Sequence, residues 1–474
     1  MAMVSGAKRR RGLEEEEEEE DEDEERLDRI SRLPDGVLGD IVALLPTNDG
    51  ARTQVLSSRW RHIWRSAPLN IDLDINPDYP LGANNVTEIV ISRILSAHQG
   101  PCRRFSIPEH YLHYRGLPVT SLDGWLESPA LDRLQELEFH YGRPCLSKLA
   151  LPLPPPPASV HRFSSTLRAV SFGGCSFTDG NNASGLHFPV LNQLSLSDVR
   201  FSESSLRALL SACPVLQSLL LMGSIGFPRV QIASQTLRSI GVRSSCGPMN
   251  LQLQHLIIED APCLERLLCF DCFCKGITIS VISAPKLLVL GPLSDQSPRL
   301  ELGTTVIQGS GLVSLKMVMH SVKVLSLSEG RLSLDVVIGY MKCFPYLERL
   351  YIQTKMAGEK NVWCRKYRNL IGTLDIRLKK IVLAGYRGNT SHVNFAKFFV
   401  LNARMLESMR LELCIAKPSP SNAWIDKQYR LLQTKNKASR DMQLDFASDY
   451  GLRLTCSFFR PEQVHDLSTA DPFP

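Results

Sequence analysis

The stretch Asp28 to Asp72 reads DRISRLPDGVLGDIVALLPTNDGARTQVLSSRWRHIWRSAPLNID and decides the fold of the N-terminal part of this chain. Pro34 suits the first turn of a helix, because the N–H that proline lacks has no partner there. The apolar residues that follow recur at helical spacing: Val37, Leu38, Ile41, Val42, Leu44 and Leu45. Pro46 ends this run, and polar residues around Thr47 and Ser57 can cap two further helices. Three short helices are predicted, and a unit this small needs a partner to cover its apolar surface.

The residues of this stretch also resemble the F-box of plant F-box proteins. The matching runs are DRIS and LPD between Asp28 and Asp35, LLPT at Leu44 to Thr47, and RTQVLSSRWRHIW at Arg52 to Trp64. Gly36 departs from the many relatives that carry a helix former there, but glycine costs little in the first turn of a helix. Periodicity by itself favours an ordinary helical subdomain. The resemblance implies docking on the Skp-type adaptor of a cullin-based ubiquitin ligase.

The same resemblance implies which positions are docking or buried positions. They are Leu33, Pro34, Ile41, Leu45, Val55, Leu56, Arg59, Trp60 and Trp64. The spacing of apolar residues is the same for residues in the internal core and for residues that contact the adaptor, so it does not divide this set. Arg59 is expected at the rim of the docking surface.

Length and composition place the chain among intracellular globular proteins. It has 474 residues, which favours two or three units over one core. An apolar content of 43% and a charged content of 22% are ordinary for such proteins. No apolar run reaches the roughly 18 residues that a membrane span needs, and no signal-peptide core is present. The thirteen cysteines are scattered and odd in number, which fits a reducing compartment, so the nucleus, the cytoplasm or both are expected.

Charge is distributed unevenly along the chain. Twelve consecutive acids occupy residues 14–25, so a formal net charge of +5 for the chain becomes +17 for the other 462 residues. Residues 1–27 are predicted to be a disordered tail, because the acidic run is too polar to bury. The basic run Lys8 to Arg11 fits either a nuclear import patch or a solvated tail. The acids can also shield the basic body from non-specific nucleic-acid binding.

An L-x-x-L-x-L spacing with apolar substitutes recurs after residue 130. Such triplets begin at Leu134, Leu167, Leu191, Leu216, Leu237, Leu264, Leu312, Val322, Leu347, Leu378 and Leu406. Many starts are 21 to 28 residues apart, the range of leucine-rich repeats. Leu287 begins a further triplet that breaks at Pro292. Leu312 and Val322 are only ten residues apart, so one of these two matches is expected to be accidental.

Phased prolines accompany these repeats. Pro189, Pro214, Pro262, Pro285 and Pro345 each lie two residues before a repeat's first leucine. Proline there ends the preceding segment and favours an extended strand. Each repeat is therefore predicted to be a strand, a loop and a return helix or irregular crossover, and stacked repeats form a curved parallel sheet. The predicted fold class is α/β, a small three-helix F-box followed by a leucine-rich-repeat solenoid with a parallel sheet.

The later chain resembles plant F-box proteins with leucine-rich repeats. The runs LIIEDAPCLERLLCFD at Leu256 to Asp271 and CFPYLERLYI at Cys343 to Ile352 carry this resemblance. Residues 393–413, VNFAKFFVLNARMLESMRLEL, are similar to the C-terminal FBD domain of such proteins, which implies a helix and a last strand at Leu406 to Leu411. His392 is expected at the surface. The expected domains are a tail (1–27), an F-box (28–72), an irregular leucine-rich-repeat solenoid (73–342), an FBD-like cap (343–415) and an extension of unclear structure (416–474).

Catalytic and metal-binding patterns are weak in this sequence. Cys269 and Cys272 have zinc-like spacing, but no second pair lies at the usual distance. His110 and His113 lack an obvious third ligand. No P-loop, dinucleotide fingerprint, nucleophile elbow or zinc-protease motif is present. No catalytic residue, metal or cofactor is therefore expected.

The F-box and the repeats together predict a substrate-recognition subunit of an SCF-type ubiquitin ligase. The F-box would bind the Skp-type adaptor, and through it a cullin, while the repeats would bind an unknown target protein. The alternative is a non-ligase scaffold or nucleic-acid-associated protein that uses the basic solenoid. Nucleic acid is not expected as the main partner, because the basic residues are dispersed without interleaved aromatics. Target binding is looked for at Ser195, Ser218, Arg238, Arg266 and Lys316, each of which also fits plain solvated surface.

Overall fold

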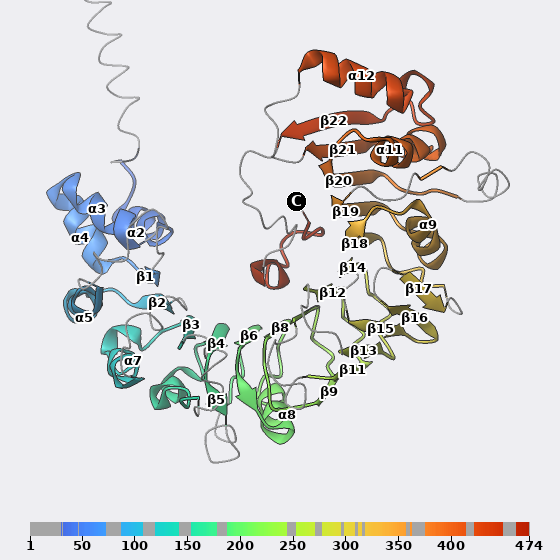
Figure 1. The fold of residues 1–474 in the computed structure, drawn as a ribbon. Helices are drawn as coiled ribbons and strands as arrows, with labels where there is room; N and C mark the ends of the chain where they lie inside the picture. Colours follow the sequence, from blue (N-terminus) through green and yellow to red (C-terminus); the bar gives the residue numbers. More distant parts are fainter. Residues whose placement is uncertain are drawn as a thin grey trace, which may run out of the picture. The chain divides into compact units, whose positions relative to one another are not determined.

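The computed structural model describes residues 30, 32–45, 47–72, 87–107, 119–141, 153–177, 187–243, 253–270, 277–294, 298–308, 311–314, 318–356, 361–362, 375–413, 421–448 and 461–473. They belong to two compact units, residues 1–108 with 117–138 and residues 109–116 with 139–474 (Figure 1). The predicted fold class is confirmed: short N-terminal helices precede a long series of parallel strands. In the part of the chain that is described, no helix has the length and apolar character to cross a membrane.

The first unit begins with the three helices that the punctuation predicts. They are α2 (Asp35–Ala43), α3 (Thr47–Arg52), which continues into the 3₁₀ turn η1 (Thr53–Val55), and α4 (Ser58–Ser66). The following elements are β1 (Leu69–Asp72), α5 (Thr87–Ala97), β2 (Cys102–Ile107), α7 (Val119–Leu126), η3 (Pro129–Leu131) and β3 (Glu136–His140). Strands β1 and β2 pair in parallel, so the first strands of the sheet precede the first predicted repeat at Leu134.

Polar contacts fasten the helices of the first unit to its strands. Thr47 Oγ1 donates a hydrogen bond of 2.6 Å to the carbonyl of Asn70 and accepts one of 2.9 Å from the N–H of Asp72. The Asn70 amide in turn donates to the carbonyl of Ala43 at the end of α2. Strand β1 therefore continues the three-helix unit without an intervening linker.

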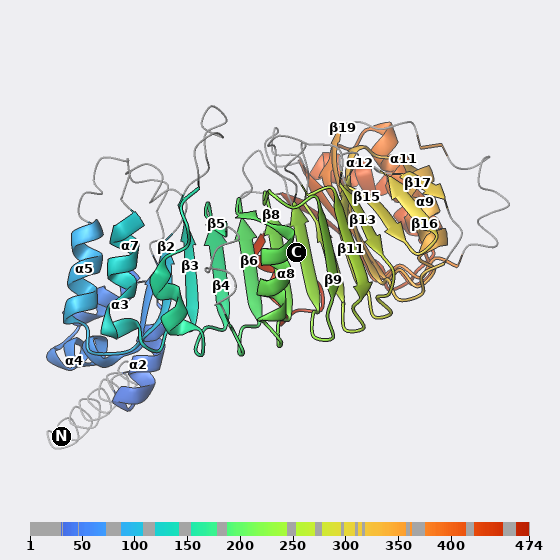
Figure 2. The same ribbon diagram turned by 90° about the horizontal axis from the view of Figure 1, so that it is seen from below.

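Among the described residues, eleven strands of the second unit form its large sheet, and neighbouring strands of this set pair in parallel. They are β4 (Ala169–Gly173), β6 (Gln193–Ser197), β8 (Ser218–Met222), β10 (Ser239–Arg243), β12 (Arg266–Cys269), β14 (Val289–Ser294), β18 (Val324–Arg331), β19 (Arg349–Met356), β20 (Lys380–Tyr386), β21 (Ser408–Leu413) and β22 (Gln443–Ser448). Each strand is followed in the sheet by the strand of the next repeat, so the sheet curves as the repeats stack (Figures 1 and 2).

The register of this sheet explains the repeated leucines. Val170, Leu194, Leu219, Ile240, Leu267, Leu290, Leu325, Leu350, Ile381, Met409 and Leu444 lie side by side across the sheet. All of them except Leu444, which is half-buried in the last strand, are buried in the core of the solenoid, where Leu194, Leu219 and Leu267 are fully buried. Because side chains alternate along a strand, the first and third residues of each strand face the opposite way. These first and third positions are called the inner face below.

The structure decides two expectations about the repeats. Leu312 lies in β17 (Gly311–Ser314), which belongs to a second sheet, so the expectation of one accidental match is confirmed and Leu312 is that match. The expectation that the triplet at Leu287 breaks at Pro292 is wrong, because β14 continues past Pro292. Proline is tolerated here because β14 shifts register between Leu290 and Leu293, where the ladder is interrupted.

Return segments of the second unit are helices or further strands. Helices α8 (Glu203–Ser211) and α9 (Leu334–Cys343) are return helices of the predicted kind. The central repeats return instead through the parallel strands β9 (Arg229–Ala233), β11 (His255–Asp260), β13 (Thr278–Val281) and β15 (Arg299–Leu302). Strands β16 (Thr305–Gln308) and β17 then join this second sheet in antiparallel fashion. A short pair, β5 (Ser176–Phe177) and β7 (Arg200–Phe201), stacks Phe177 on Phe201 at 4.4 Å.

The C-terminal part extends further than the FBD resemblance implied. Helix α11 (Thr390–Asn402) is the helix that the FBD resemblance implied, and it buries Phe395, Ala396, Phe398 and Phe399. Strand β21 is not the last strand, because β22 pairs with it in parallel. The expectation that His392 lies at the surface is wrong. Its side chain is fully buried, and Nδ1 accepts a 3.0 Å hydrogen bond from the N–H of Arg387. The remaining elements are α12 (Asn422–Leu432) and the 3₁₀ turns η5 (Ala158–Phe163), η7 (Thr434–Asn436) and η8 (Pro461–Val464).

Candidate functional site

The three N-terminal helices enclose a small apolar core. Leu38, Val42, Trp60, Ile63 and Ala67 are buried together, and Leu33 and Trp64 pack against them. The core is tight, since a Cβ placed on Gly50 of α3 would come within 2.6 Å of the Trp64 ring. Replacement of these side chains would therefore disturb the fold of the helices before it disturbed any partner.

A second group of apolar side chains in the same helices is exposed. Val37, Ile41 and Leu44 follow at intervals of four and three residues along α2, so they share one side of the helix. Leu44 is 84% exposed, and Val55 and Leu56 in the turn before α4 are 86% and 66% exposed. Ile30 is also exposed. A helix that is apolar on two sides buries one side in its own core and leaves the other for a partner.

Arg59 connects the beginning of α4 to the beginning of α2. Its guanidinium lies 2.7 Å from the Asp35 carboxylate and donates a 2.6 Å hydrogen bond to the carbonyl of Leu33. The side chain is about 39% exposed, so the ion pair is partly screened by solvent. Arg59 therefore holds the two helices in register while its edge stays accessible.

The structure divides the docking set that the sequence left undivided. Pro34, Ile41, Val55 and Leu56 are exposed, Leu45, Leu33, Arg59 and Trp64 are half-buried, and Trp60 is buried. Sequence reasoning left Ile30, Val37 and Leu44 out of this set, although they are among the exposed side chains. The signal was available, because α2 carries more apolar residues than one stripe needs.

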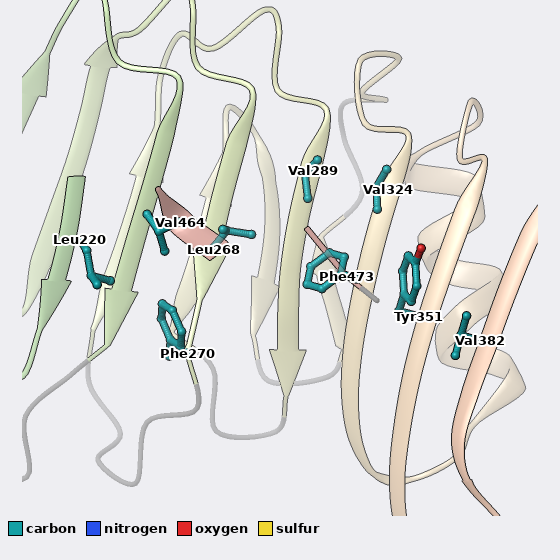
Figure 3. Packing of buried hydrophobic residues seen from close by; sticks show 9 residues of the cluster. All are labelled: Leu220, Leu268, Phe270, Val289, Val324, Tyr351, Val382, Val464 and Phe473. Carbon is teal, nitrogen blue, oxygen red and sulfur yellow. The ribbon is translucent and has the colours of Figure 1, made fainter. Parts of the chain in front are cut away.

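The inner face of the second unit is apolar at its centre. Leu220, Leu268, Phe270, Val289, Val324, Tyr351 and Val382 form one buried cluster there (Figure 3). The side chains that cover it belong to residues 461–473, called the C-terminal segment below. Val464 and Phe473 lie in the cluster and are 0% and 3% exposed. Figure 1 shows this segment on the concave side of the large sheet, and Figure 3 shows Val464 and Phe473 among the side chains of its strands.

His465 is held between two strands of the inner face. Its Nε2 lies 2.6 Å from Ser195 Oγ in β6, and its Nδ1 lies 2.6 Å from Ser218 Oγ in β8. Burial lowers the pKa of His465 from 6.5 to about 4, so the ring is neutral at neutral pH. One hydroxyl then donates to the unprotonated ring nitrogen, while the other accepts from the ring N–H.

Three further side chains of the sheet hold the rest of the segment. Arg266 in β12 is buried, and its guanidinium donates to the main-chain carbonyls of Asp466, at 2.5 Å, and of Thr469. Arg349 in β19 forms a 2.9 Å ion pair with Asp471, and the Tyr351 hydroxyl donates to the same carboxylate oxygen. Burial raises the pKa of the Tyr351 phenol, and the Asp471 carboxylate raises it further.

These contacts show where the proposed target residues lie. Ser195, Ser218 and Arg266 are buried under the C-terminal segment, so the expectation of solvated surface is wrong for them. Arg238 forms a 2.9 Å ion pair with Glu265 of the next repeat. Lys316 lies outside the described residues. The segment itself was missed, because residues 416–474 show no repeat spacing and its partners are some 120 to 270 residues away in sequence.

Metal binding has no geometric support in the part of the chain that is described. No three His, Cys, Asp or Glu side chains gather there in a way that could hold an ion. Cys269 is buried in β12, and a buried thiol in apolar surroundings is chemically inert. Cys272, His110 and His113 lie outside the described residues.

Comparison with known proteins finds three family matches along the chain. Residues 30–72 match the F-box domain, residues 122–352 match the LRR repeats of the FBD-associated F-box protein At5g56370, and residues 368–411 match the FBD. The curated relatives include three Arabidopsis thaliana proteins. F-box/FBD/LRR-repeat protein At1g51370 is 27% identical (45% of this chain, 46% of the relative). F-box/FBD/LRR-repeat protein At3g52680 is 33% identical (40% of each), and F-box/LRR-repeat protein At3g03360 is 29% identical (41% and 38%).

This chain spans about half the length of the curated relatives that it matches. The matches occur in the order F-box, leucine-rich repeats and FBD, which is the order of the elements described above. The exposed apolar residues of α2 and η1 fall within the first match, and the inner face from β4 to β19 falls within the second. The chain therefore matches, along its length, an F-box, leucine-rich repeats and an FBD, the three parts that the names of its F-box/FBD/LRR-repeat relatives state.

Proposed function

We propose that this protein is the substrate-recognition subunit of an SCF-type ubiquitin ligase. Its F-box would dock on a Skp-type adaptor, and through it on a cullin, and its leucine-rich-repeat unit would bind a target protein. It would perform no bond chemistry itself. It would raise the local concentration of a target lysine near the ubiquitin-conjugating enzyme.

The observation that carries this proposal is the exposed apolar side of the F-box. Val37, Ile41, Leu44, Val55 and Leu56 are all at least 40% exposed, although a filled core lies directly behind α2. Exposed apolar clusters of this kind mark protein–protein interaction sites. The alternative of a basic scaffold has less support, because basic side chains of the repeats are paired with acids. The pairs include Arg238–Glu265, Lys323–Glu348, Lys379–Glu348 and Arg349–Asp471.

The test measures binding of the full chain to a purified Skp-type adaptor by isothermal titration calorimetry. The variant Val55→Asp with Leu56→Asp places charge on the exposed turn without touching the core. We expect wild type to bind and this variant to bind at least about tenfold more weakly, because interface centres contribute more than 1 kcal/mol per residue. Trp60→Ala would be a poorer choice, because Trp60 lies in the core.

Ile282→Asp is the matched control for this experiment. Ile282 is 67% exposed, close to the 66% of Leu56, and lies in the second unit. It should bind the adaptor as wild type does. A well-folded wild-type chain that shows no adaptor binding would remove the proposal and bring the basic-scaffold alternative forward.

A further inference from the structure

The inner face has the character of a binding groove rather than a solvated surface. Its central strands present Leu220, Leu268, Val289 and Val324 at positions that would meet water if nothing covered them. A seat for one side chain is built into this face at Gly241 of β10. A Cβ there would come within 2.5 Å of Val464 and 2.9 Å of Leu220, so the missing side chain makes room for Val464.

The groove binds the main chain of the C-terminal segment as well as its side chains. Arg266 donates to two carbonyl oxygens, those of Asp466 and Thr469, and any residue could supply these oxygens. Between these two points Ser468 is exposed, and so is Ala470 beyond them. Recognition at this step therefore places no demand on the side chains of residues 468–470.

The end of the segment carries the most specific contact. Both oxygens of the Asp471 carboxylate are used: Oδ2 accepts from Arg349 and Tyr351, and Oδ1 accepts a 3.1 Å hydrogen bond from the N–H of Phe473. The second bond turns the chain and places the Phe473 ring 5.2 Å from the Tyr351 ring. An acidic residue followed two positions later by an aromatic one is thus the pattern that this end of the groove fits.

The C-terminal segment leaves polar groups of the groove unused. The large sheet includes no strand from residues 461–473. An open surface pocket of about 200 Å³ is lined by residues of the segment itself: Gln463, Asp466, Thr469, Asp471, Pro472 and Phe473. Within the described residues, the buried hydroxyls of Ser239 and Ser326 on the inner face have no hydrogen-bond partner. A ligand that fits the groove better than this segment could form hydrogen bonds with these two hydroxyls.

We propose that the inner face is a peptide-binding groove which the chain's own C-terminal segment occupies, and that a target segment of the same chemistry competes for it. That target segment has an acidic residue followed two positions later by an aromatic residue, and an apolar residue that enters the seat at Gly241. The inference deepens the proposed function by naming the target-binding surface. It does not depend on adaptor binding and is tested without the adaptor.

The experiment uses the full chain and a fluorescein-labelled synthetic peptide, QVHDLSTADPFP, which is the sequence of residues 463–474. Fluorescence anisotropy measures its binding to wild type and to the variant Asp471→Ala with Phe473→Ala, whose own segment is weakened. We expect the weakened variant to bind the peptide at least about tenfold more tightly than wild type, because a segment on the same chain competes at an effective concentration on the order of mM. A peptide that carries alanine in place of both Asp471 and Phe473 should not bind.

A groove variant and its matched control make the test specific. Adding Arg349→Ala to the weakened variant should abolish peptide binding. Adding Arg410→Ala should leave it unchanged, because Arg410 pairs with Glu412 at 3.1 Å and is similarly exposed at 50%, against 42% for Arg349. A folded weakened variant that does not bind the peptide would overturn the proposal. So would equal binding with and without Arg349.

Hydrogen–deuterium exchange of the wild-type chain decides the matter if the weakened variant does not fold. The proposal requires amides of residues 463–473 to exchange much faster than those of β12 and β19, because an exchangeable occupant opens without unfolding the sheet. Exchange as slow as that of the strands would show a permanent part of the fold and overturn the proposal. Neither outcome bears on adaptor binding, so failure here and failure of the proposed function are distinguishable.

Discussion

Arg349 and Asp471 form an ion pair of 2.9 Å between residues that are 122 positions apart in sequence. The pair joins β19 to the last described turn of the chain, and the Tyr351 hydroxyl donates to the same carboxylate oxygen. The hydrogen bond to the Asp471 carboxylate raises the pKa of Arg349 above its usual value, so the guanidinium stays charged. The position of the C-terminal segment rests on this contact more than on any local preference for structure.

A double-mutant cycle should show coupling between these two residues. Arg349→Ala and Asp471→Asn are each expected to destabilise the chain, and together to cost less than the sum of the two. The coupling should be about 1 kcal/mol, because Arg349 is partly exposed and solvent screens the pair. Urea unfolding of the four chains measures it, and additive effects would show that the pair does not hold the segment.

Acid should release the C-terminal segment through His465. Its pKa is 6.5 in an open chain and about 4 in the fold, so the released segment takes up the proton first. The stabilising contribution of the neutral ring is complete above pH 6.5 and is lost as pH falls toward about 4, by up to about 1.4 kcal/mol per pH unit. Asp466, the neighbouring acid, has a pKa below its usual range and does not titrate in this window.

Hydrogen exchange of residues 463–473, corrected for its intrinsic pH dependence, measures this release. Protection should fall between pH 6.5 and pH 4.5, while β19 stays protected. His465→Gln is the control, because an amide can bond to Ser195 or Ser218 without taking up a proton. A pH dependence that persists in this variant would assign the effect to other groups.

Filling the seat at Gly241 should expel Val464. A leucine there cannot coexist with the present position of Val464, because even its Cβ would come within 2.5 Å. Gly241→Leu is expected to remove the exchange protection of residues 463–473 while leaving the sheet folded. Gly124→Ala in α7 is the control, because nothing lies within 4 Å of its added Cβ, and it should stabilise the chain by about 0.5–1 kcal/mol. A protected segment in Gly241→Leu would contradict the assigned seat.

Trp60 and Leu44 should differ sharply in their effect on stability. Trp60→Ala removes a buried ring from the F-box core and should cost about 3–5 kcal/mol. Leu44→Ala should change stability by less than about 0.5 kcal/mol, because Leu44 is 84% exposed. Urea unfolding followed by circular dichroism compares the two variants. Equal costs would mean that Leu44 packs within the protein and is not free to meet a partner.

Much of the local structure could be predicted from the sequence. The helices from Asp35 to Ser66 and the parallel strands at most L-x-x-L-x-L triplets follow from spacing and from proline positions, because short-range periodicity decides which face of an element is apolar. The same reasoning failed at Pro292, and it left open which of the Leu312 and Val322 matches is accidental. A register shift admits the proline, and pairing with β16 places Leu312 in a different sheet, and neither is a local property.

The sequence by itself determined the order of F-box, repeats and FBD and the identity of their core leucines, because each repeat buries its apolar residues against the next by the same local rule. Only the tertiary structure decided which apolar residues of the F-box are buried in its core and which are exposed to solvent. Only the tertiary structure also placed His465 between Ser195 and Ser218 and Asp471 on Arg349. Those contacts join residues more than a hundred positions apart through single side chains, and the periodicity of a sequence does not predict such contacts.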